Sequence, residues 1–211
     1  MRTRGLELIG IAALLVGCPS TRVYRTAEPV AAGEWRGAVS AGAGFLRDRE
    51  QNTRMPTGHV ELELRRGVSP NADVGLKLFT VGVDASATLR FLRRDTWSLA
   101  IAPQLTFVRT PKTALTTNAI HLFGGATFLA TRRFSPGVAL TFGPSIGGGA
   151  YFPEAGGHVA GLFLGTFVNL ELALGKRSWL VPELSGFNVV SGEVPVRGAG
   201  AFLGVSFRFG F

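Results

Sequence analysis

Apolar and polar residues alternate along most of the chain after residue 33. In one early stretch, Leu62 and Leu64 alternate with Glu61 and Glu63. Because successive side chains of a strand point to opposite faces, this period of two predicts β-strands with one apolar and one polar face. The ten predicted strands cover residues 34–46, 58–66, 72–80, 82–92, 97–108, 119–131, 137–149, 159–174, 179–187 and 198–211. The ninth is the least regular, because it contains Pro182.

The connections between these strands differ in length. Four are tight and rich in turn-forming Pro, Gly, Asn and Asp, namely 67–71, 93–96, 132–136 and 175–178. Of the connections at the other end, 47–57, 109–118, 150–158 and 188–197 are longer, and only 80–82 is short. Short turns at one end and longer loops at the other are typical of outer-membrane barrels.

Alternation alone does not say which face points inward, because a soluble barrel hides its apolar face and a membrane barrel shows it to lipid. The predicted strands run to about 9–14 residues, longer than the roughly 5–6 residues common in soluble proteins. The chain of 211 residues is 46% hydrophobic and only 17% charged. We therefore expect an all-β fold, an antiparallel up-and-down transmembrane β-barrel of ten strands, or of eight if some segments are misassigned. A soluble periplasmic β-barrel lipoprotein that binds an apolar ligand is the alternative.

The three tryptophans support the membrane orientation. Trp35, Trp97 and Trp179 stand at the start of the first, fifth and ninth predicted strands. These three positions would share one rim of the barrel, where a girdle of aromatic side chains is expected at the membrane interface.

The last residues carry a second signal. Phe207, Phe209 and Phe211 alternate with polar residues or glycine up to the end of the chain. This ending resembles the C-terminal signal of small outer-membrane β-barrel proteins, and the resemblance covers residues 34–211. It implies that the barrel-assembly machinery is a partner during insertion.

The first residues have the layout of a secretory signal. Arg2 and Arg4 precede an apolar core at residues 8–16 that is too short to span a bilayer. The core ends in Leu15, Val16, Gly17 and Cys18, and Cys18 is the only cysteine. This ending resembles the bacterial lipobox, which implies cleavage before Cys18, acylation of its sulfur and contact with the lipoprotein-sorting machinery. An ordinary signal peptide with an incidental cysteine is the alternative.

These features divide the chain into three parts. We expect a lipoprotein signal peptide at 1–17, a lipidated tether leaving the membrane surface at 18–33 and the barrel at 34–211. An even number of strands puts both barrel ends on one side, which we expect to be periplasmic if Cys18 carries lipid. The expected location is the outer membrane, with its lipids as partners. The sequence leaves the oligomeric state open.

The polar face of the predicted strands would line the lumen. Its charged residues include Glu61, Glu63, Arg65, Lys77, Asp84, Arg90, Glu171, Glu183 and Arg208, with Arg36 and Asp73. Their mixed signs predict an ion-pair network that fills a narrow lumen, because an unpaired buried charge is costly. We therefore expect a structural or passive role. A narrow solute channel is the alternative.

An outer-membrane hydrolase, a protease or a lipid A-modifying enzyme, is a further alternative. His59 lies near Asp48 and Glu50 across the first loop, and His158 follows Glu154 by four residues. No sequence motif of these enzyme families is present, so we expect no enzymatic activity. The three histidines lie on different segments and give no metal-ligand spacing, and no cofactor is predicted.

Basic pairs flank the tight turns and account for much of the net charge of +8. The eight residues are Arg65, Arg66, Arg93, Arg94, Arg132, Arg133, Lys176 and Arg177. They predict a basic rim that attracts anionic phospholipid headgroups, or simply solvated turns. Nucleic-acid binding is not expected, because no basic face interleaved with aromatic residues remains once the strands are assigned.

Overall fold

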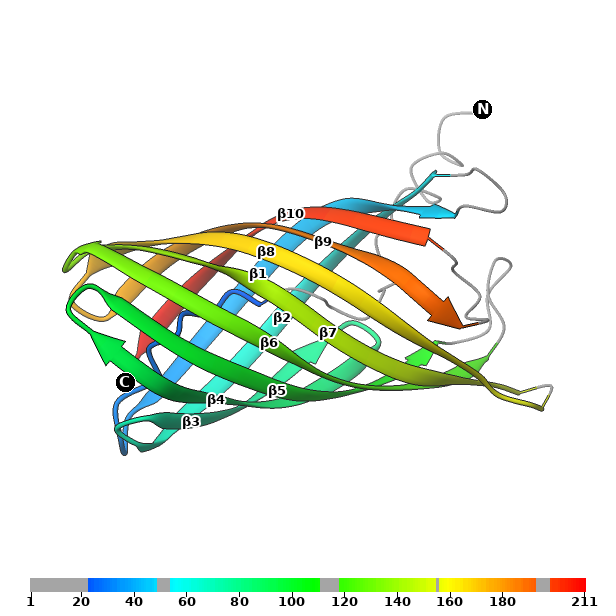
Figure 1. The fold of residues 1–211 in the computed structure, drawn as a ribbon, viewed down its shortest axis with the longest axis horizontal. Coiled ribbons are helices and arrows are strands. Elements are labelled where there is room, and N and C mark those ends of the chain that lie inside the picture. Colours follow the sequence, from blue (N-terminus) through cyan, green and yellow to red (C-terminus); the bar gives the residue numbers. More distant parts are fainter. Residues whose placement is uncertain (1–22, 49–53, 111–117, 155, 193–197) are drawn as a thin grey trace, which may run out of the picture.

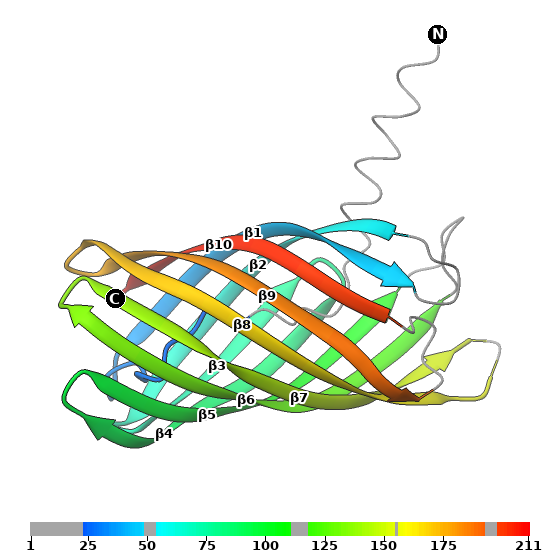
Figure 2. The same cartoon turned by 45° about the horizontal axis from the view of Figure 1, so that its top comes forward.

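The chain forms a closed barrel of ten antiparallel strands in a computed structural model (Figures 1 and 2). The structure describes residues 23–48, 54–110, 118–154, 156–192 and 198–211. The strands are β1 (Trp35–Asp48), β2 (Arg54–Ser69), β3 (Ala72–Phe79), β4 (Gly82–Arg94), β5 (Trp97–Thr110), β6 (Ala119–Ser135), β7 (Val138–Pro153), β8 (Val159–Gly175), β9 (Ser178–Gly192) and β10 (Gly198–Gly210). Each strand pairs with the next along the chain, and β1 pairs with β10 to close the cylinder.

The prediction of ten strands is confirmed, and the eight-strand alternative is wrong. The largest difference is at β9, which continues to Gly192, and β2, β6 and β7 also extend beyond their predicted ends. Pro182 weakens the alternation of β9, yet it pairs with Val205 inside an uninterrupted register with β10. No helix in the described part of the chain is long and apolar enough to cross a membrane.

The apolar faces of the strands point outward and the charged faces point inward. Leu62 and Leu76 are 53% and 49% exposed on the outer surface, whereas the neighbouring Glu61 and Lys77 are 1% and 5% exposed. A soluble barrel would bury the leucines and expose the charges. The alternative of a soluble barrel with an apolar core is therefore wrong.

The two rims of the barrel differ. Four tight turns connect β2–β3, β4–β5, β6–β7 and β8–β9 at one end, which we call the short-turn rim; the opposite end is the long-loop rim. The backbones of Trp35 and Phe211 exchange hydrogen bonds of 3.2 and 3.1 Å at the short-turn rim. Both ends of the barrel domain therefore lie at this rim.

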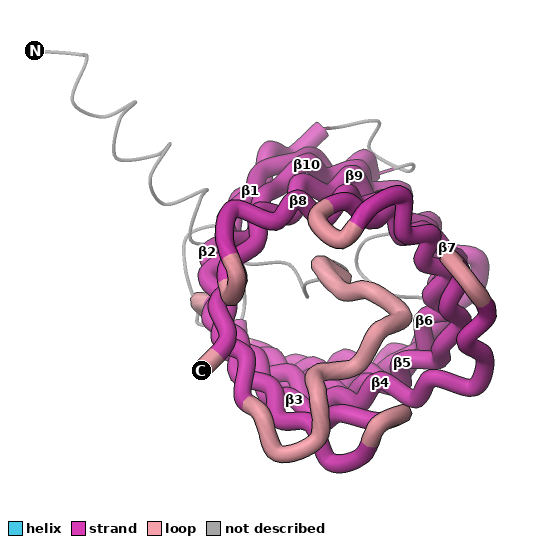
Figure 3. Tube along the Cα trace, turned by 90° about the vertical axis from the view of Figure 1, so that its left-hand side faces the viewer, coloured by secondary structure: helices cyan, strands magenta, loops and turns pink. Residues whose placement is uncertain are grey.

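The residues before β1 lie inside the barrel. Seen from the short-turn rim in Figure 3, this stretch leaves the wall and runs into the lumen. Val23, Ala27 and Val30 are buried there at 7%, 0% and 2% exposure. We expected a tether leaving the membrane surface, but residues 23–30 fill the lumen instead, and we call them the luminal segment. The reason is that its backbone and side chains bond to groups on the barrel wall, as described next.

Candidate functional site

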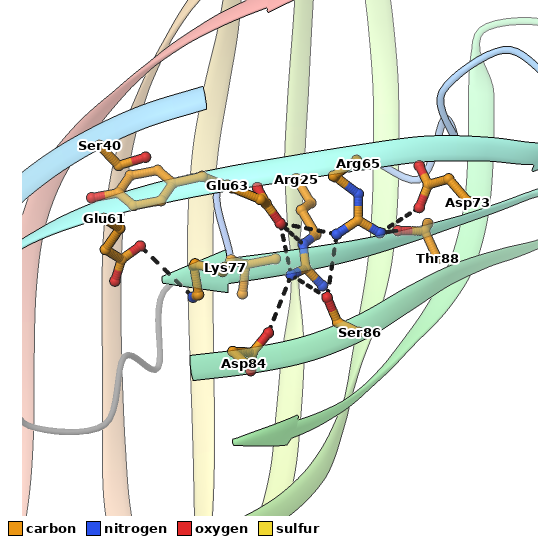
Figure 4. Close-up of polar contacts among 12 residues, drawn as sticks. Arg25, Ser40, Glu61, Glu63, Arg65, Asp73, Lys77, Asp84, Ser86 and Thr88 are labelled. Carbon is orange, nitrogen blue, oxygen red and sulfur yellow. Dashed lines mark hydrogen bonds and ion pairs between the residues drawn. The ribbon is translucent and has the colours of Figure 1, made fainter. Parts of the chain in front are cut away.

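One wall of the lumen carries a chain of buried charges (Figure 4). Arg65 of β2 donates a hydrogen bond of 2.9 Å to Glu63 and forms a second ion pair with Asp73. Its guanidinium also donates to the hydroxyl of Thr88 at 3.1 Å. Gly75 makes room for this side chain, because a Cβ there would lie 2.6 Å from Arg65 Nη1. Neighbouring strands thus hold the guanidinium rigidly between two carboxylates.

The wall of β5, β6 and β7 carries small side chains at the same depth. Ala100, Thr131, Ala139 and Thr141 are 0% exposed. Because these side chains are short, they leave a space between themselves and the charged wall of β2–β4. Val23 and Ala27 of the luminal segment pack into that space, in one apolar cluster with Leu129 and other residues of β5, β6 and β8.

Backbone N–H groups of the luminal segment donate hydrogen bonds to side chains of three strands. Glu183 of β9 accepts hydrogen bonds from the N–H groups of Val23, at 3.0 Å, and Tyr24. Further along, Ala27 N donates to the hydroxyl of Thr131 in β6 at 2.7 Å. Near the rim, Val30 N donates to Asp73 of β3 at 2.8 Å. These bonds satisfy backbone donors that would otherwise be buried without partners, which is costly.

Arg25 connects the luminal segment to the charged wall. Its Nη2 lies 3.0 Å from Glu63 Oε1 and 3.7 Å from Asp84 Oδ1. The same nitrogen donates a hydrogen bond of 2.7 Å to the hydroxyl of Ser86. On the other side, Asn169 Nδ2 donates to the carbonyl of Arg25 at 3.0 Å. One residue of the segment therefore joins strands on opposite sides of the lumen.

A second ion cluster holds the segment nearer the short-turn rim. Glu28 pairs with Arg133 of β6, and Arg133 lies 3.6 Å from Glu171 of β8. Glu171 in turn accepts a hydrogen bond of 2.8 Å from Arg208 of β10. The cavity beside the segment measures about 20 Å³. That volume holds roughly one water molecule.

Carboxylates outnumber cations midway along the lumen. Glu61, Glu63, Asp84 and Glu183 all lie there, and the wall supplies Arg65, which is 2.9 Å from Glu63, and Lys77, which is 3.7 Å from Glu61. Both carboxylate oxygens of Glu61 and one of Asp84 have no hydrogen-bond partner among the described residues. The guanidinium of Arg25 therefore balances part of an acidic excess that belongs to the barrel itself.

The residues that join the luminal segment to β1 cross the short-turn rim beside Gly67. Gly33 N donates to Gly67 O at 2.9 Å, and Gly67 N donates to Glu34 O at 3.0 Å. A Cβ at position 67 would lie 2.0 Å from the carbonyl oxygen of Ala31. Because no side chain fits that space, this crossing requires glycine.

The structure brings together most of the residues predicted to line the lumen. Those on the inner wall are Glu61, Glu63, Arg65, Asp73, Lys77, Asp84, Glu171, Glu183 and Arg208. Arg90 does not join them: it lies at the short-turn rim and donates to Pro70 O at 2.7 Å and to Asn71. Arg25 and Glu28, which were not predicted to line the lumen, also take part. Small residues on the inner faces of β5–β7 were the available signal that the lumen holds something more.

The three tryptophans all lie near the short-turn rim, but they do not share one face of the barrel wall. Trp35 and Trp97 lie on the outer surface. The guanidinium of Arg66 lies over the Trp35 ring, 5.4 Å from its centroid, and that of Arg132 lies over the Trp97 ring, 5.7 Å from its centroid. Trp179 shares its strand face with Glu183, since the two are four residues apart, and therefore lies on the luminal side. Arg36 stacks 4.7 Å from its ring. The terminal residues Phe207, Phe209 and Phe211 are exposed on the outside and contact one another in sequence.

Six of the eight basic turn residues are exposed at the short-turn rim, namely Arg66, Arg93, Arg94, Arg132, Lys176 and Arg177. Arg65 and Arg133 do not join this exposed set, because alternation turns their side chains toward the lumen, although Arg133 also donates to Pro136 O in the β6–β7 turn at 3.2 Å. Cys18, with the preceding residues Leu15, Val16 and Gly17, lies outside the described residues.

The three histidines lie beside different groups of the barrel. His59 pairs with Gly42, well along β1 from Asp48, and its ring lies 3.7 Å from Glu61. His158 stacks on Phe152, whereas Glu154 accepts a hydrogen bond of 2.9 Å from Asn118. His121 packs against Phe123 and Tyr151. Glu50 lies outside the described residues, within which no group of three or more metal-ligating side chains is found.

Several solved barrels resemble this chain at low identity. Neisserial surface protein A is 13% identical, with a TM-score of 0.49 over 85% of this chain and 98% of that chain. The outer membrane protease OmpT from Escherichia coli is 9% identical, with a TM-score of 0.47 over 84% and 97%. The translocator domain of the autotransporter NalP from Neisseria meningitidis is 10% identical, with a TM-score of 0.40 over 98% and 94%.

No protein-family model matches the chain, and no curated protein does. With TM-scores below 0.5, the structural likenesses carry no argument about function. What the molecule does must be argued from the geometry of its own surface and lumen.

Proposed function

We propose that this chain is an outer-membrane β-barrel, anchored by lipid at Cys18, with a structural rather than a transport or catalytic role. The luminal segment is the observation that carries the proposal. It bonds to strands around the barrel and leaves a cavity of about 20 Å³ beside it. Such a lumen gives solutes no continuous path.

The outer surface supports the membrane location. Leucine, valine and phenylalanine cover the outside, as expected of an apolar band facing lipid. The exposed guanidiniums of Arg66 and Arg132 lie over Trp35 and Trp97 at the short-turn rim. Aromatic and basic side chains together suit the headgroup region of anionic lipids. We place this rim in the periplasm, where the barrel-assembly and lipoprotein-sorting machinery would meet the chain.

Conductance tests the closed lumen. We expect the purified full-length protein, inserted into planar lipid bilayers, to produce no steady conductance steps. Faster migration of the unboiled protein on a detergent gel establishes that the inserted protein is folded. Steady channels formed by the folded wild-type protein would overturn the structural role and favour the alternative of a narrow solute channel.

Acylation is tested separately in bacterial cells that produce the chain. We expect a labelled fatty acid to be incorporated into the wild-type protein and lost in Cys18→Ala. Ser20→Ala is the matched control and keeps the label. An unlabelled wild-type protein would overturn the anchoring, while leaving the closed barrel untouched.

A further inference from the structure

Three arginines meet on the inner wall where β2, β1 and β10 approach the short-turn rim. Arg36 lies directly opposite Arg65 of β2 and pairs with Gly210 of β10 on its other side. Arg208 pairs with Ala38, two residues further along β1, and therefore lies diagonally from Arg36 on the same face. Diagonal neighbours in a sheet stand about 7–8 Å apart, within reach of long side chains. Like charges at such positions repel each other, so this part of the wall requires negative charge.

Two of the three arginines, Arg36 and Arg208, are not fully compensated by carboxylates. Arg208 shares its partner Glu171 with Arg133, which lies 3.6 Å from the same carboxylate. Arg36 forms no ion pair with a carboxylate of the described residues, and its guanidinium lies over the ring of Trp179 instead. Arg36 and Arg208 therefore have at most one carboxylate between them.

One nitrogen of Arg208 has no acceptor. The residue is 3% exposed, and its Nη1 donates a hydrogen bond to Glu171. Its Nη2 has no hydrogen-bond partner among the described residues. A buried donor without an acceptor is costly, and more so when the donor is charged, so this nitrogen requires a bound water molecule or anion.

Arg36 and Arg208 line the cavity of about 20 Å³ beside the luminal segment. The segment contributes residues 24–26 and Glu28 to the lining, and the barrel walls contribute the rest. Four guanidiniums and three carboxylates line the cavity, which gives the lining a net positive charge. Of the carboxylates that make up the acidic excess midway along the lumen, Glu63 alone belongs to this lining.

The size and position of the cavity restrict its occupant. A cavity of about 20 Å³ holds roughly one water molecule, and chloride is only slightly larger. Phosphate and sulfate carry four oxygen atoms around a central atom and do not fit. Arg36, the second residue of β1, is half-buried near the short-turn rim, so ions can reach the cavity from the water on that side.

We propose that a small monatomic anion, chloride, binds in this cavity against the guanidiniums of Arg36 and Arg208 and thereby holds the luminal segment in the barrel. Water would accept the free N–H of Arg208, but only an anion also compensates the excess positive charge. Because the segment and the wall both line the cavity, the site exists only while the segment is docked. An anion that binds this state alone stabilises it by mass action. The proposal rests on the docked segment and not on acylation of Cys18.

Protection of Arg25 from trypsin measures docking of the segment as the anion is changed. The folded full-length protein in detergent micelles is digested in sodium chloride or in sodium gluconate of equal ionic strength, and cleavage after Arg25 is followed by mass spectrometry. Gluconate is too large for the cavity. Cleavage follows the population of the undocked segment when docking is fast. We therefore expect cleavage to be about tenfold slower once chloride reaches about ten times its dissociation constant.

Arg36→Gln is the informative variant, because Arg36 has no ion-pair partner that the substitution would leave uncompensated. We expect Arg36→Gln to be cleaved at similar rates in the two salts. Lys176→Gln is the matched control: it removes an exposed positive charge at the same rim and should keep the full difference between chloride and gluconate. The boiled and unboiled gel bands show that each variant is folded. Crystals grown in bromide then locate the ion, and we expect an anomalous peak between Arg36 and Arg208.

Slow cleavage of the wild-type protein at equal rates in the two salts would overturn the anion site and leave the closed lumen intact. Rapid cleavage in both salts would reject the docked segment, and with it both the anion site and the closed lumen. A bromide peak without a chloride effect on cleavage would mean an adventitious ion only, and a water molecule in place of the peak would equally overturn the proposal. Loss of the chloride effect in Lys176→Gln as well as in Arg36→Gln would show a general effect of charge instead of a site.

Discussion

Arg25 places one guanidinium among carboxylates of two strands. Its Nη2 lies 3.0 Å from Glu63 and 3.7 Å from Asp84, and the side chains of Arg25, Glu63 and Asp84 are 6%, 8% and 1% exposed. Buried pairs of this kind add little net stability over apolar packing, but removal of one partner leaves an uncompensated charge. Arg25 therefore matters for stability mainly because it compensates the charges of carboxylates that are already buried.

Replacement of Arg25 by glutamine should destabilise the barrel. We expect Arg25→Gln to lower the free energy of unfolding by about 3–5 kcal/mol, the typical cost of breaking a buried ion pair. Urea unfolding in detergent micelles, followed by tryptophan fluorescence, measures it. Lys176→Gln removes an exposed positive charge and should change the free energy by less than about 0.5 kcal/mol. Equal effects of the two substitutions would show that Arg25 is not held as described.

Gly67 acts on the luminal segment in a different way, because its lack of a side chain leaves room for the chain to pass the rim. We expect Gly67→Ala to displace the segment, because the new Cβ would lie 2.0 Å from Ala31 O. Trypsin cleavage after Arg25, detected by mass spectrometry, should then rise well above its level in the wild-type protein. Gly124→Ala is the matched control, because nothing lies within 4 Å of a Cβ there. Continued protection of Arg25 in folded Gly67→Ala would contradict the prediction.

At the scale of elements, the luminal segment and the wall of β2–β4 complement each other in charge. The wall brings four carboxylates, those of Glu61, Glu63, Asp73 and Asp84, close to only two cations, Arg65 and Lys77. The segment supplies Arg25 to this acidic region and backbone N–H groups to other wall residues. If the segment left, the lumen would open with its acidic excess uncovered.

Removal of the segment should therefore convert a closed barrel into a cation-selective pore. We expect folded Gly67→Ala to conduct in planar bilayers and to prefer K⁺ over Cl⁻, as measured by the reversal potential in a KCl gradient. Adding Glu61→Gln should weaken this preference, because Glu61 is 1% exposed on the luminal wall. Adding Glu34→Gln, at the exposed rim, should weaken it less. Anion selectivity would contradict the assignment of the acidic region.

At the scale of the whole molecule, the barrel is inverted relative to a soluble protein. Most of its large apolar side chains face outward, and most of its buried positions are charged, polar or small, although a few large apolar residues such as Leu129 and Phe167 are also buried. The interior does not provide an apolar core large enough to account for folding in water. Stability then depends on lipid that covers the outer surface and on the luminal segment, which bonds to the polar and charged groups of the inner wall.

The cost of placing a charge on the outer surface should depend on its depth in the bilayer, and this dependence tests the orientation of the barrel wall. We expect Leu62→Arg, in the middle of β2, to cost about 2–4 kcal/mol in lipid vesicles, and Val68→Arg, near the short-turn rim, about 0–1 kcal/mol. The two residues are similarly exposed, at 53% and 56%, so their difference measures depth in the bilayer. Urea unfolding from the vesicles gives both values. Equal costs would contradict a membrane-spanning barrel.

The sequence by itself determined the ten strands, the connections and the face that each residue occupies. Alternation is a local property, since neighbouring side chains must point to opposite sides of a strand whatever its partners are. It predicted that Glu61 and Glu63 share a face and that Leu62 and Leu64 share the other. It was weaker for the ninth strand, where Pro182 interrupts the pattern: Trp179 was predicted in an outward girdle, whereas it shares the luminal face of Glu183.

Only the tertiary structure decided what fills the lumen. The bonds that hold the luminal segment join residues far apart in sequence, such as Ala27 with Thr131, 104 residues away, and Val23 with Glu183, 160 residues away. Residues 23–30 have no period of their own, because they bond in turn to β9, β6 and β3 rather than to one neighbouring strand. Such contacts exist only once the barrel has closed, so no local pattern could distinguish a luminal segment from a free tether.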